Sequence, residues 1–107
     1  MSALEELNLS HNQIGNVGCE VLAAVLRLPS CNIRTLNIEH NQISNEGLNA
    51  IANELTSNKK LKKLYVDRSA IDQDVTAAFS RLSFYASTSI NGIDQVVFSR
   101  LACVYIK

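Results

Sequence analysis

Three segments of the chain show the same alternation of apolar and polar residues. They cover residues 4–14, 33–43 and 61–71, in which Leu7, Leu36 and Leu64 are equivalent and lie 29 and then 28 residues apart. Apolar residues two positions apart fall on one face of a strand. The chain is therefore predicted to repeat one structural unit, each copy of which begins with a short strand.

A stretch with helical spacing follows each predicted strand. Its apolar residues recur three and four positions apart, which places them on one face of a helix of about three turns. Asn16, Asn45 and Asp72 stand where an N-cap is expected, and Pro29 is expected to end the first helix. The predicted helical core residues are Val17, Val21, Leu22, Val25 and Leu26, then Leu48, Ile51, Ala52 and Leu55, then Val75, Ala78, Phe79 and Leu82.

The strand segments share the pattern LxxLxLxxN, with Leu, Ile or Val at the apolar positions. The asparagine is Asn12 in the first copy and Asn41 in the second, and Ser69 replaces it in the third. This pattern resembles the leucine-rich repeat in its longer, ribonuclease-inhibitor-like type. The resemblance implies an α/β fold, a short right-handed β-α solenoid with parallel strands on its concave side and helices on its convex side.

The polar residue at the end of each pattern is expected to be structural. An asparagine side chain can both donate hydrogen bonds to backbone groups in the turn and accept hydrogen bonds from them. Serine makes fewer such bonds, so the third turn, at Ser69, is predicted to be looser than the turns at Asn12 and Asn41.

The predicted repeats occupy residues 1–82, with copies at about 4–32, 33–60 and 61–82. Residues 83–107 form an atypical C-terminal segment, either a degenerate repeat or a cap, because the open end of a stack of repeats exposes apolar core. Ile90 and Ile93 keep the spacing of a fourth strand. Gln95, however, falls at a core position, where a buried amide would need hydrogen-bond partners.

The C-terminal segment predicts a loop at residues 83–89 and a turn at Asn91-Gly92. Two alternatives remain for the residues after the turn: a helix capped by Asp94, or a strand over residues 102–106. The helix would carry on one side Val96, Val97, Leu101 and Val104.

The composition is typical of a single globular domain. The chain has 107 residues, of which 47% are hydrophobic and 19% charged, and ten Lys and Arg balance ten Asp and Glu. No net field favours nucleic acid or an anionic membrane. No apolar run reaches the roughly 18 residues of a membrane span, and no signal-peptide pattern is present. We expect a cytoplasmic or otherwise intracellular protein that binds neither nucleic acid nor membrane.

Few residues suggest chemistry, and no catalytic motif is present. His11 and His40 are equivalent residues of adjacent units, but two ligands make a poor metal site and Arg68 takes the third position, so neither metal nor cofactor is expected. Three cysteines are too few for a disulfide scaffold. The sequence predicts small buried hydrophobes at Cys19, Cys31 and Cys103.

One charge run stands out on this neutral chain. It consists of Lys59, Lys60, Lys62 and Lys63. It forms either a solvated edge or a contact for a phosphate or an acidic partner, and binding of that kind would weaken steeply with salt.

Strand alternation selects the residues that would meet a partner. If Leu7 and Leu9 point inward, the residues between them point to the concave face and stack in three columns. Tyr65 is the expected anchor, because tyrosine combines apolar area with a hydroxyl group at low entropic cost. The predicted partner-binding residues are Glu6, Asn8, Ser10, Thr35, Asn37, Glu39, Lys63, Tyr65 and Asp67.

The sequence thus favours a non-enzymatic protein–protein interaction module, whose protein partner it does not identify, bound by the concave strand face and adjoining loops. The alternative is a structural or truncated repeat fragment that mainly self-associates or packs on missing repeats. A first strand without a cap exposes unpaired backbone groups. A homo-oligomer formed through the uncapped ends belongs to this alternative.

Overall fold

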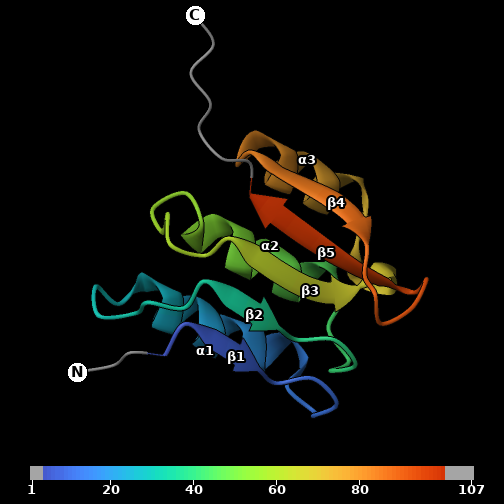
Figure 1. Ribbon diagram of the computed structural model, residues 1–107, viewed down its shortest axis with the longest axis horizontal. Helices are drawn as coiled ribbons and strands as arrows, with labels where there is room; N and C mark the ends of the chain where they lie inside the picture. Colours follow the sequence, from blue (N-terminus) through green and yellow to red (C-terminus); the bar gives the residue numbers. More distant parts are fainter. Residues whose placement is uncertain (1–3, 101–107) are drawn as a thin grey trace, which may run out of the picture.

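The computed structural model describes residues 4–100. Within this range the chain forms one mixed five-stranded sheet, three α-helices and one 3₁₀-helix, so the fold is α/β (Figure 1). The strand order is β1-β2-β3-β5-β4. In chain order the elements are β1 (Glu6–Asn8), α1 (Gly15–Arg27), β2 (Thr35–Asn37), α2 (Asn45–Glu54), β3 (Lys63–Asp67), η1 (Arg68–Ala70), α3 (Gln73–Arg81), β4 (Phe84–Thr88) and β5 (Gln95–Arg100).

Strands β1, β2 and β3 are parallel and in the register that the repeat predicts. Leu7 pairs with Leu36, and Leu36 pairs with Leu64, so the three equivalent leucines are neighbours across the sheet. Leu36 is 1% exposed and Leu64 is fully buried, whereas Leu7 on the edge strand is partly buried. Each unit therefore completes the core of its neighbour, which a single strand and helix could not do alone.

The helices bury or partly bury the predicted residues of the second and third units, and of the first unit Leu22, Val25 and Leu26. Leu48, Ile51, Ala52 and Leu55 are buried at α2, and Val75 and Phe79 at α3. In α1 the prediction is wrong for Val17 and Val21, which are 75% and 60% exposed, and Cys19 and Ala23 are buried instead. Apolar residues lie on most sides of α1, so the spacing of apolar residues alone does not determine which face is buried. Packing against α2 determines it.

Polar side chains join the helix N-termini of neighbouring units. Asp72 caps α3 as predicted, but Ser44, not Asn45, caps α2. Asn16 does not cap its own helix: its Oδ1 accepts hydrogen bonds from the amides of Ser44 and Gly47 in the next unit, at 3.0 and 3.1 Å. Asn45 likewise reaches forward, and its Nδ2 donates to Asp72 Oδ2 at 2.9 Å. These asparagines fix the spacing between helices rather than their starts.

Residues 84–100 form an antiparallel hairpin, which corrects two predictions. The expected loop at 83–89 is largely β4, and the helix, one of the two alternatives after Asp94, is wrong, since β5 occupies these residues as far as 100. The predicted turn at Asn91-Gly92 lies in the hairpin loop. No fourth strand begins at Ile90 and Ile93, which are 97% and 79% exposed in the same loop. The alternative strand at 102–106, with Leu101, Cys103 and Val104, lies outside the described residues.

Strand β5 has a clear physical basis in its own alternation. Val96 and Phe98 are buried, whereas Val97 between them is only partly buried, which is a strand period and not a helical one. The Phe98 ring stacks on that of Phe79 in α3 with centroids 4.3 Å apart. Gln95 is buried although no fourth repeat forms, and its side-chain amide donates to Asp67 Oδ1 at 3.4 Å.

Arg100, the last residue of β5, binds the hairpin to the second unit. Its guanidinium donates to the carbonyl oxygens of Leu55 and Asn58, at 3.1 and 2.9 Å, just beyond the C-terminus of α2. It also lies 4.5 Å above the Phe84 ring centroid. Burial lowers the pKa of this guanidinium. A cation at a helix C-terminus is stabilising because it donates hydrogen bonds to the unpaired carbonyls and because it lies at the negative end of the helix dipole.

None of the helices within residues 4–100 is long and apolar enough to cross a membrane.

The buried leucine spine provides the first test of this fold. We expect Leu36→Ala to lower the free energy of unfolding by about 2–5 kcal/mol, because it opens a cavity between two units. Val17→Ala, at an exposed position of α1, is the control and should change stability by no more than about 0.5 kcal/mol. Urea unfolding monitored by circular dichroism measures both. Equal effects of the two substitutions would contradict the strand assignment.

Candidate functional site

The sheet face that points away from the helices collects the residues on which a partner could dock. Register aligns Glu6 with Thr35 and Lys63, and Asn8 with Asn37 and Tyr65. The columns continue onto the hairpin, because paired residues of neighbouring strands share a face. We call this surface the open sheet face; it comprises Glu6, Asn8, Thr35, Asn37, Lys63, Tyr65, Tyr85, Ser87, Val97 and Ser99.

Tyr65 lies at the centre of the open sheet face. It pairs with Asn37 on one side and with Val97 on the other, and it is partly exposed. Lys63 pairs with Ser99, which in turn pairs with Tyr85. Tyr85 is 51% exposed, so the face carries a second aromatic anchor beside the expected one.

Sequence reasoning missed the hairpin's contribution to this face, namely Tyr85, Ser87, Val97 and Ser99. The alternation of buried Val96 and Phe98 with Val97 and Ser99 was the available signal. It was outweighed because Val96, Val97, Leu101 and Val104 also fit a helical spacing.

Two asparagines of the open sheet face have their oxygens engaged in turns. Asn8 Oδ1 accepts from the amide of Ser10, and Asn37 Oδ1 from the amide of Glu39, both at 2.9 Å. Such side-chain-to-backbone bonds help to end a strand. Tyr65 interrupts this series, so the third unit presents a ring where the first two present an amide.

The third predicted column does not form an exposed surface. Glu39 is 2% exposed, because the hairpin loop covers it and Asn91 Nδ2 donates to Glu39 Oε1 at 2.7 Å. Asp67 accepts from the His40 amide at 2.9 Å and from Gln95. Ser10 Oγ donates to Asn8 at 2.6 Å. The column of Ser10, Glu39 and Asp67 is therefore engaged within the chain, and Glu39 is not available to a partner.

Asn41 joins the first two units. It is fully buried, and its Nδ2 donates to the carbonyl oxygen of Leu9 at 2.8 Å and to those of Ile38 and Glu39. Its Oδ1 accepts from the amides of Asn12 and Ile14, at 3.0 and 3.3 Å. One side chain thus satisfies backbone groups from both units.

The equivalents of Asn41 are less engaged. Asn12 is exposed, and its Nδ2 donates to the carbonyl oxygens of Leu9 and Ser10. Ser69 is also exposed and lies within η1. That turn is closed by backbone bonds, from Ile71 to the Arg68 carbonyl at 3.0 Å and from Arg68 to the Asp94 carbonyl at 2.7 Å. The hairpin therefore supplies a contact in the turn where the asparagine is missing.

His11 and His40 occupy the same left-handed turn position in adjacent units, with φ of 60° and 58°. Their rings stack with centroids 4.3 Å apart. Arg68, at the third position, turns toward the hairpin and donates to the Ile93 carbonyl at 3.0 Å. Across residues 4–100, no three metal-ligating side chains gather in one place.

The two cysteines in the described range are packing residues, as predicted. Cys19 and Cys31 are buried and unbridged. Burial raises the pKa of the Cys19 thiol to about 11. The protonated thiol that results at neutral pH is a weak nucleophile.

Comparison with known proteins matches these units to one class. A family model described as Leucine Rich repeat matches residues 2–23 and 30–52. Residues 2–23 and 30–52 are therefore similar to leucine-rich repeats, which generally mediate protein–protein interaction and are generally non-enzymatic. NACHT, LRR and PYD domains-containing protein 3 of Bos taurus is 38% identical over 68 residues. That match covers 64% of this chain but only 7% of the relative's length.

Asn41 offers a direct test of how the units are joined. We expect Asn41→Ala to lower the free energy of unfolding by at least about 1–3 kcal/mol, because it leaves buried carbonyl and amide groups unsatisfied. Asn12→Ala, at the exposed equivalent, is the matched control and should cost about 1 kcal/mol or less. Thermal unfolding of the two variants decides the point, and an unchanged melting midpoint for Asn41→Ala would contradict it.

Proposed function

We propose that this chain is a non-enzymatic protein–protein interaction module that binds its partner on the open sheet face. The observation that carries the proposal is the pair of accessible tyrosines, Tyr65 and Tyr85, on the face of the sheet opposite to α1, α2 and α3 (Figure 1). Tyrosine is enriched among the residues that dominate binding energy at interfaces. Lys63 and Glu6 add charged groups at the rim of the same face.

The size of the open sheet face suits a modest interface. Neighbouring strands lie about 4.8 Å apart, so the five strands of the sheet, from β1 at one edge to β4 at the other, span about 20 Å. A standard interface buries about 800 Å² on each partner. The hairpin strands supply part of the area that three strands would lack.

We further propose that residues 4–32, 33–60 and 61–82 are three repeats stacked as a short solenoid and that the hairpin caps the last of them. Two contacts support the capping role. Strand β5 pairs along the outer edge of β3, and Arg100 binds carbonyl oxygens beyond the C-terminus of α2. An open edge at β3 would otherwise expose unpaired backbone groups.

Site-specific photo-crosslinking tests the proposed binding face. A photoreactive phenylalanine analogue in place of Tyr65 should capture the same protein in the native cell as one in place of Tyr85. The same analogue in place of Ala77, an exposed residue of α3, is the control and should not capture it.

Competition completes this test. Unlabelled wild-type chain should reduce the capture at Tyr65, and an unlabelled Tyr65→Ala/Tyr85→Ala chain with wild-type melting behaviour should compete about tenfold less well. Equal competition by the two chains, or equal capture at all three positions, would place the binding site elsewhere.

A second candidate function, self-association with a second copy, is favoured by one observation. The edge formed by β1 and the outer side of α1 exposes Leu4, Val17, Val21 and Leu28, with fractions between 48% and 75%. Strand β1 pairs only with β2 among the described strands. The hairpin covers the other end of the sheet, so a second copy would use this same edge in a two-fold arrangement.

Oligomeric state separates this candidate from the first. Light scattering of the wild-type chain should show a dimer fraction that rises with concentration, and Val21→Lys should abolish it by placing a charge in the apolar contact. Ala77→Lys on α3 is the control. A wild-type chain that stays monomeric from micromolar to millimolar concentration would rule the dimer out.

A further inference from the structure

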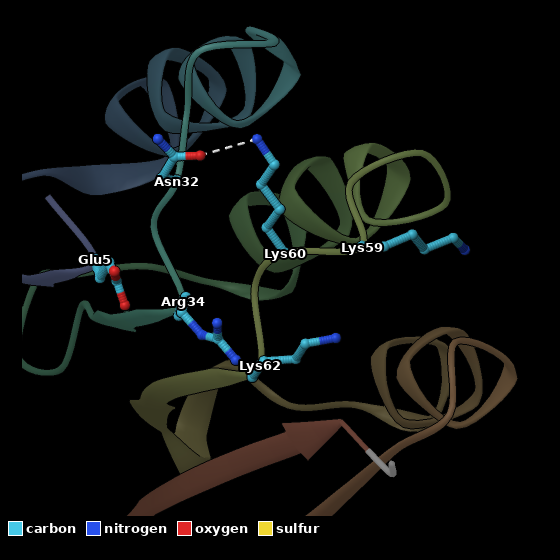
Figure 2. Close-up of a pocket in the computed structure, with 6 residues that line it drawn as sticks. All are labelled: Glu5, Asn32, Arg34, Lys59, Lys60 and Lys62. Atoms are coloured by element: carbon cyan, nitrogen blue, oxygen red, sulfur yellow. Dashed lines mark hydrogen bonds between the residues drawn. The ribbon is translucent and has the colours of Figure 1, made fainter. Parts of the chain in front are cut away.

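A basic pocket opens beside the open sheet face, where β2 and β3 begin (Figure 2). It has a volume of about 380 Å³ and is lined by Glu5, Asn32, Arg34, Lys59, Lys60 and Lys62. We call this site the basic pocket. The register of the parallel strands brings its residues together, because the Arg34 amide donates to the Glu5 carbonyl and the Lys62 amide to the Arg34 carbonyl, both at 2.7 Å. Residues from three successive units are thereby placed side by side.

The pocket concentrates positive charge on a chain with no net charge. Within residues 4–100 the lining carries four cationic side chains and one carboxylate, that of Glu5. Among the described residues, the side chains of Arg34, Lys59 and Lys62 make no hydrogen bond or salt bridge, whereas Lys60 Nζ donates to Asn32 Oδ1 at 3.0 Å and to the Pro29 carbonyl at 3.2 Å. Like charges gathered in a concave site attract an anionic group.

The backbone around the pocket indicates what kind of anion fits. The amides of Lys60 and Leu61 donate to Asn58 Oδ1, and those of Arg34, Lys62 and Lys63 donate to the carbonyl oxygens of Glu5 and Arg34, just before β1 and β2. No backbone amide among these is left to cradle a phosphate, which phosphate-binding loops require. The groups that these five amides leave for an anion include the side chains of Arg34, Lys59 and Lys62, and a guanidinium can bind a carboxylate through two parallel hydrogen bonds.

We infer that the basic pocket binds an acidic segment of a protein partner through its carboxylates. This inference rests on the proposed function, because the segment belongs to a partner lying on the open sheet face next to the pocket. Lys63, the neighbour of Lys62, belongs to that face. Within residues 4–100 no aromatic residue lines the pocket, which disfavours a nucleic acid, since a nucleic acid needs a longer basic track and stacking platforms.

Fluorescence anisotropy with a labelled Glu-rich peptide tests the inference, with the same peptide bearing Gln in place of every Glu as the reference probe. The Glu-rich peptide should bind more tightly than the Gln peptide, and its affinity should fall as salt is added. Arg34→Gln should weaken its binding about three- to tenfold, whereas Glu5→Gln should strengthen it about twofold or more. Arg81→Gln and Glu20→Gln, which remove the same charges from α3 and α1, should leave it unchanged.

Three results would overturn the inference: equal affinity for the Glu and Gln peptides, equal weakening by Arg34→Gln and Arg81→Gln, or stronger binding of inorganic phosphate or a single-stranded RNA than of the Glu-rich peptide. Tyr65→Ala keeps the two proposals apart. It should leave binding of the Glu-rich peptide unchanged, since Tyr65 does not line the pocket. Either proposal, the one for the basic pocket or the one for the open sheet face, can therefore be disproved while the other stands.

Discussion

The lateral register of β1, β2 and β3 is the constraint on which the rest of the molecule depends. Leu7, Leu36 and Leu64 set it through burial, and Asn41 fixes it by bonding backbone groups of two units at once. Both proposed surfaces are products of this register. The open sheet face and the basic pocket take residues from successive units. A shift of the strand register by one residue would turn core side chains outward and separate the residues of both surfaces.

The hairpin of β4 and β5 completes what the repeated units begin. It covers the edge of β3, binds the α2 terminus through Arg100 and buries Glu39 beneath its loop. It also extends the open sheet face by two strands. Because β5 runs antiparallel, the sheet is mixed, and the regular parallel arrangement ends at β3.

The sequence predicted the features that recur in each repeat. The strand register, the buried faces of α2 and α3 and the place of Tyr65 beside Asn37 follow from positions that recur at a fixed spacing. It predicted only part of the buried face of α1, through Leu22, Val25 and Leu26, since Val17 and Val21 are equally apolar and only packing against α2 decides which residues are buried. Nor did it predict β5, whose valines fit two periods, or Arg34 and Glu5 in the basic pocket, which lie far from the lysine run in the chain and join it only through register.

The pairing of β3 with β5 is the point at which the account is most directly tested. Backbone bonds link Arg68 with Asp94 and Arg100 with Lys62, so Tyr65 and Val97 face each other as a non-hydrogen-bonded pair with close Cα atoms. Nuclear Overhauser spectroscopy should therefore show a strong contact between the Hα atoms of Tyr65 and Val97. A helical pattern of amide–amide contacts across residues 94–100, without the Tyr65–Val97 contact, would contradict the account.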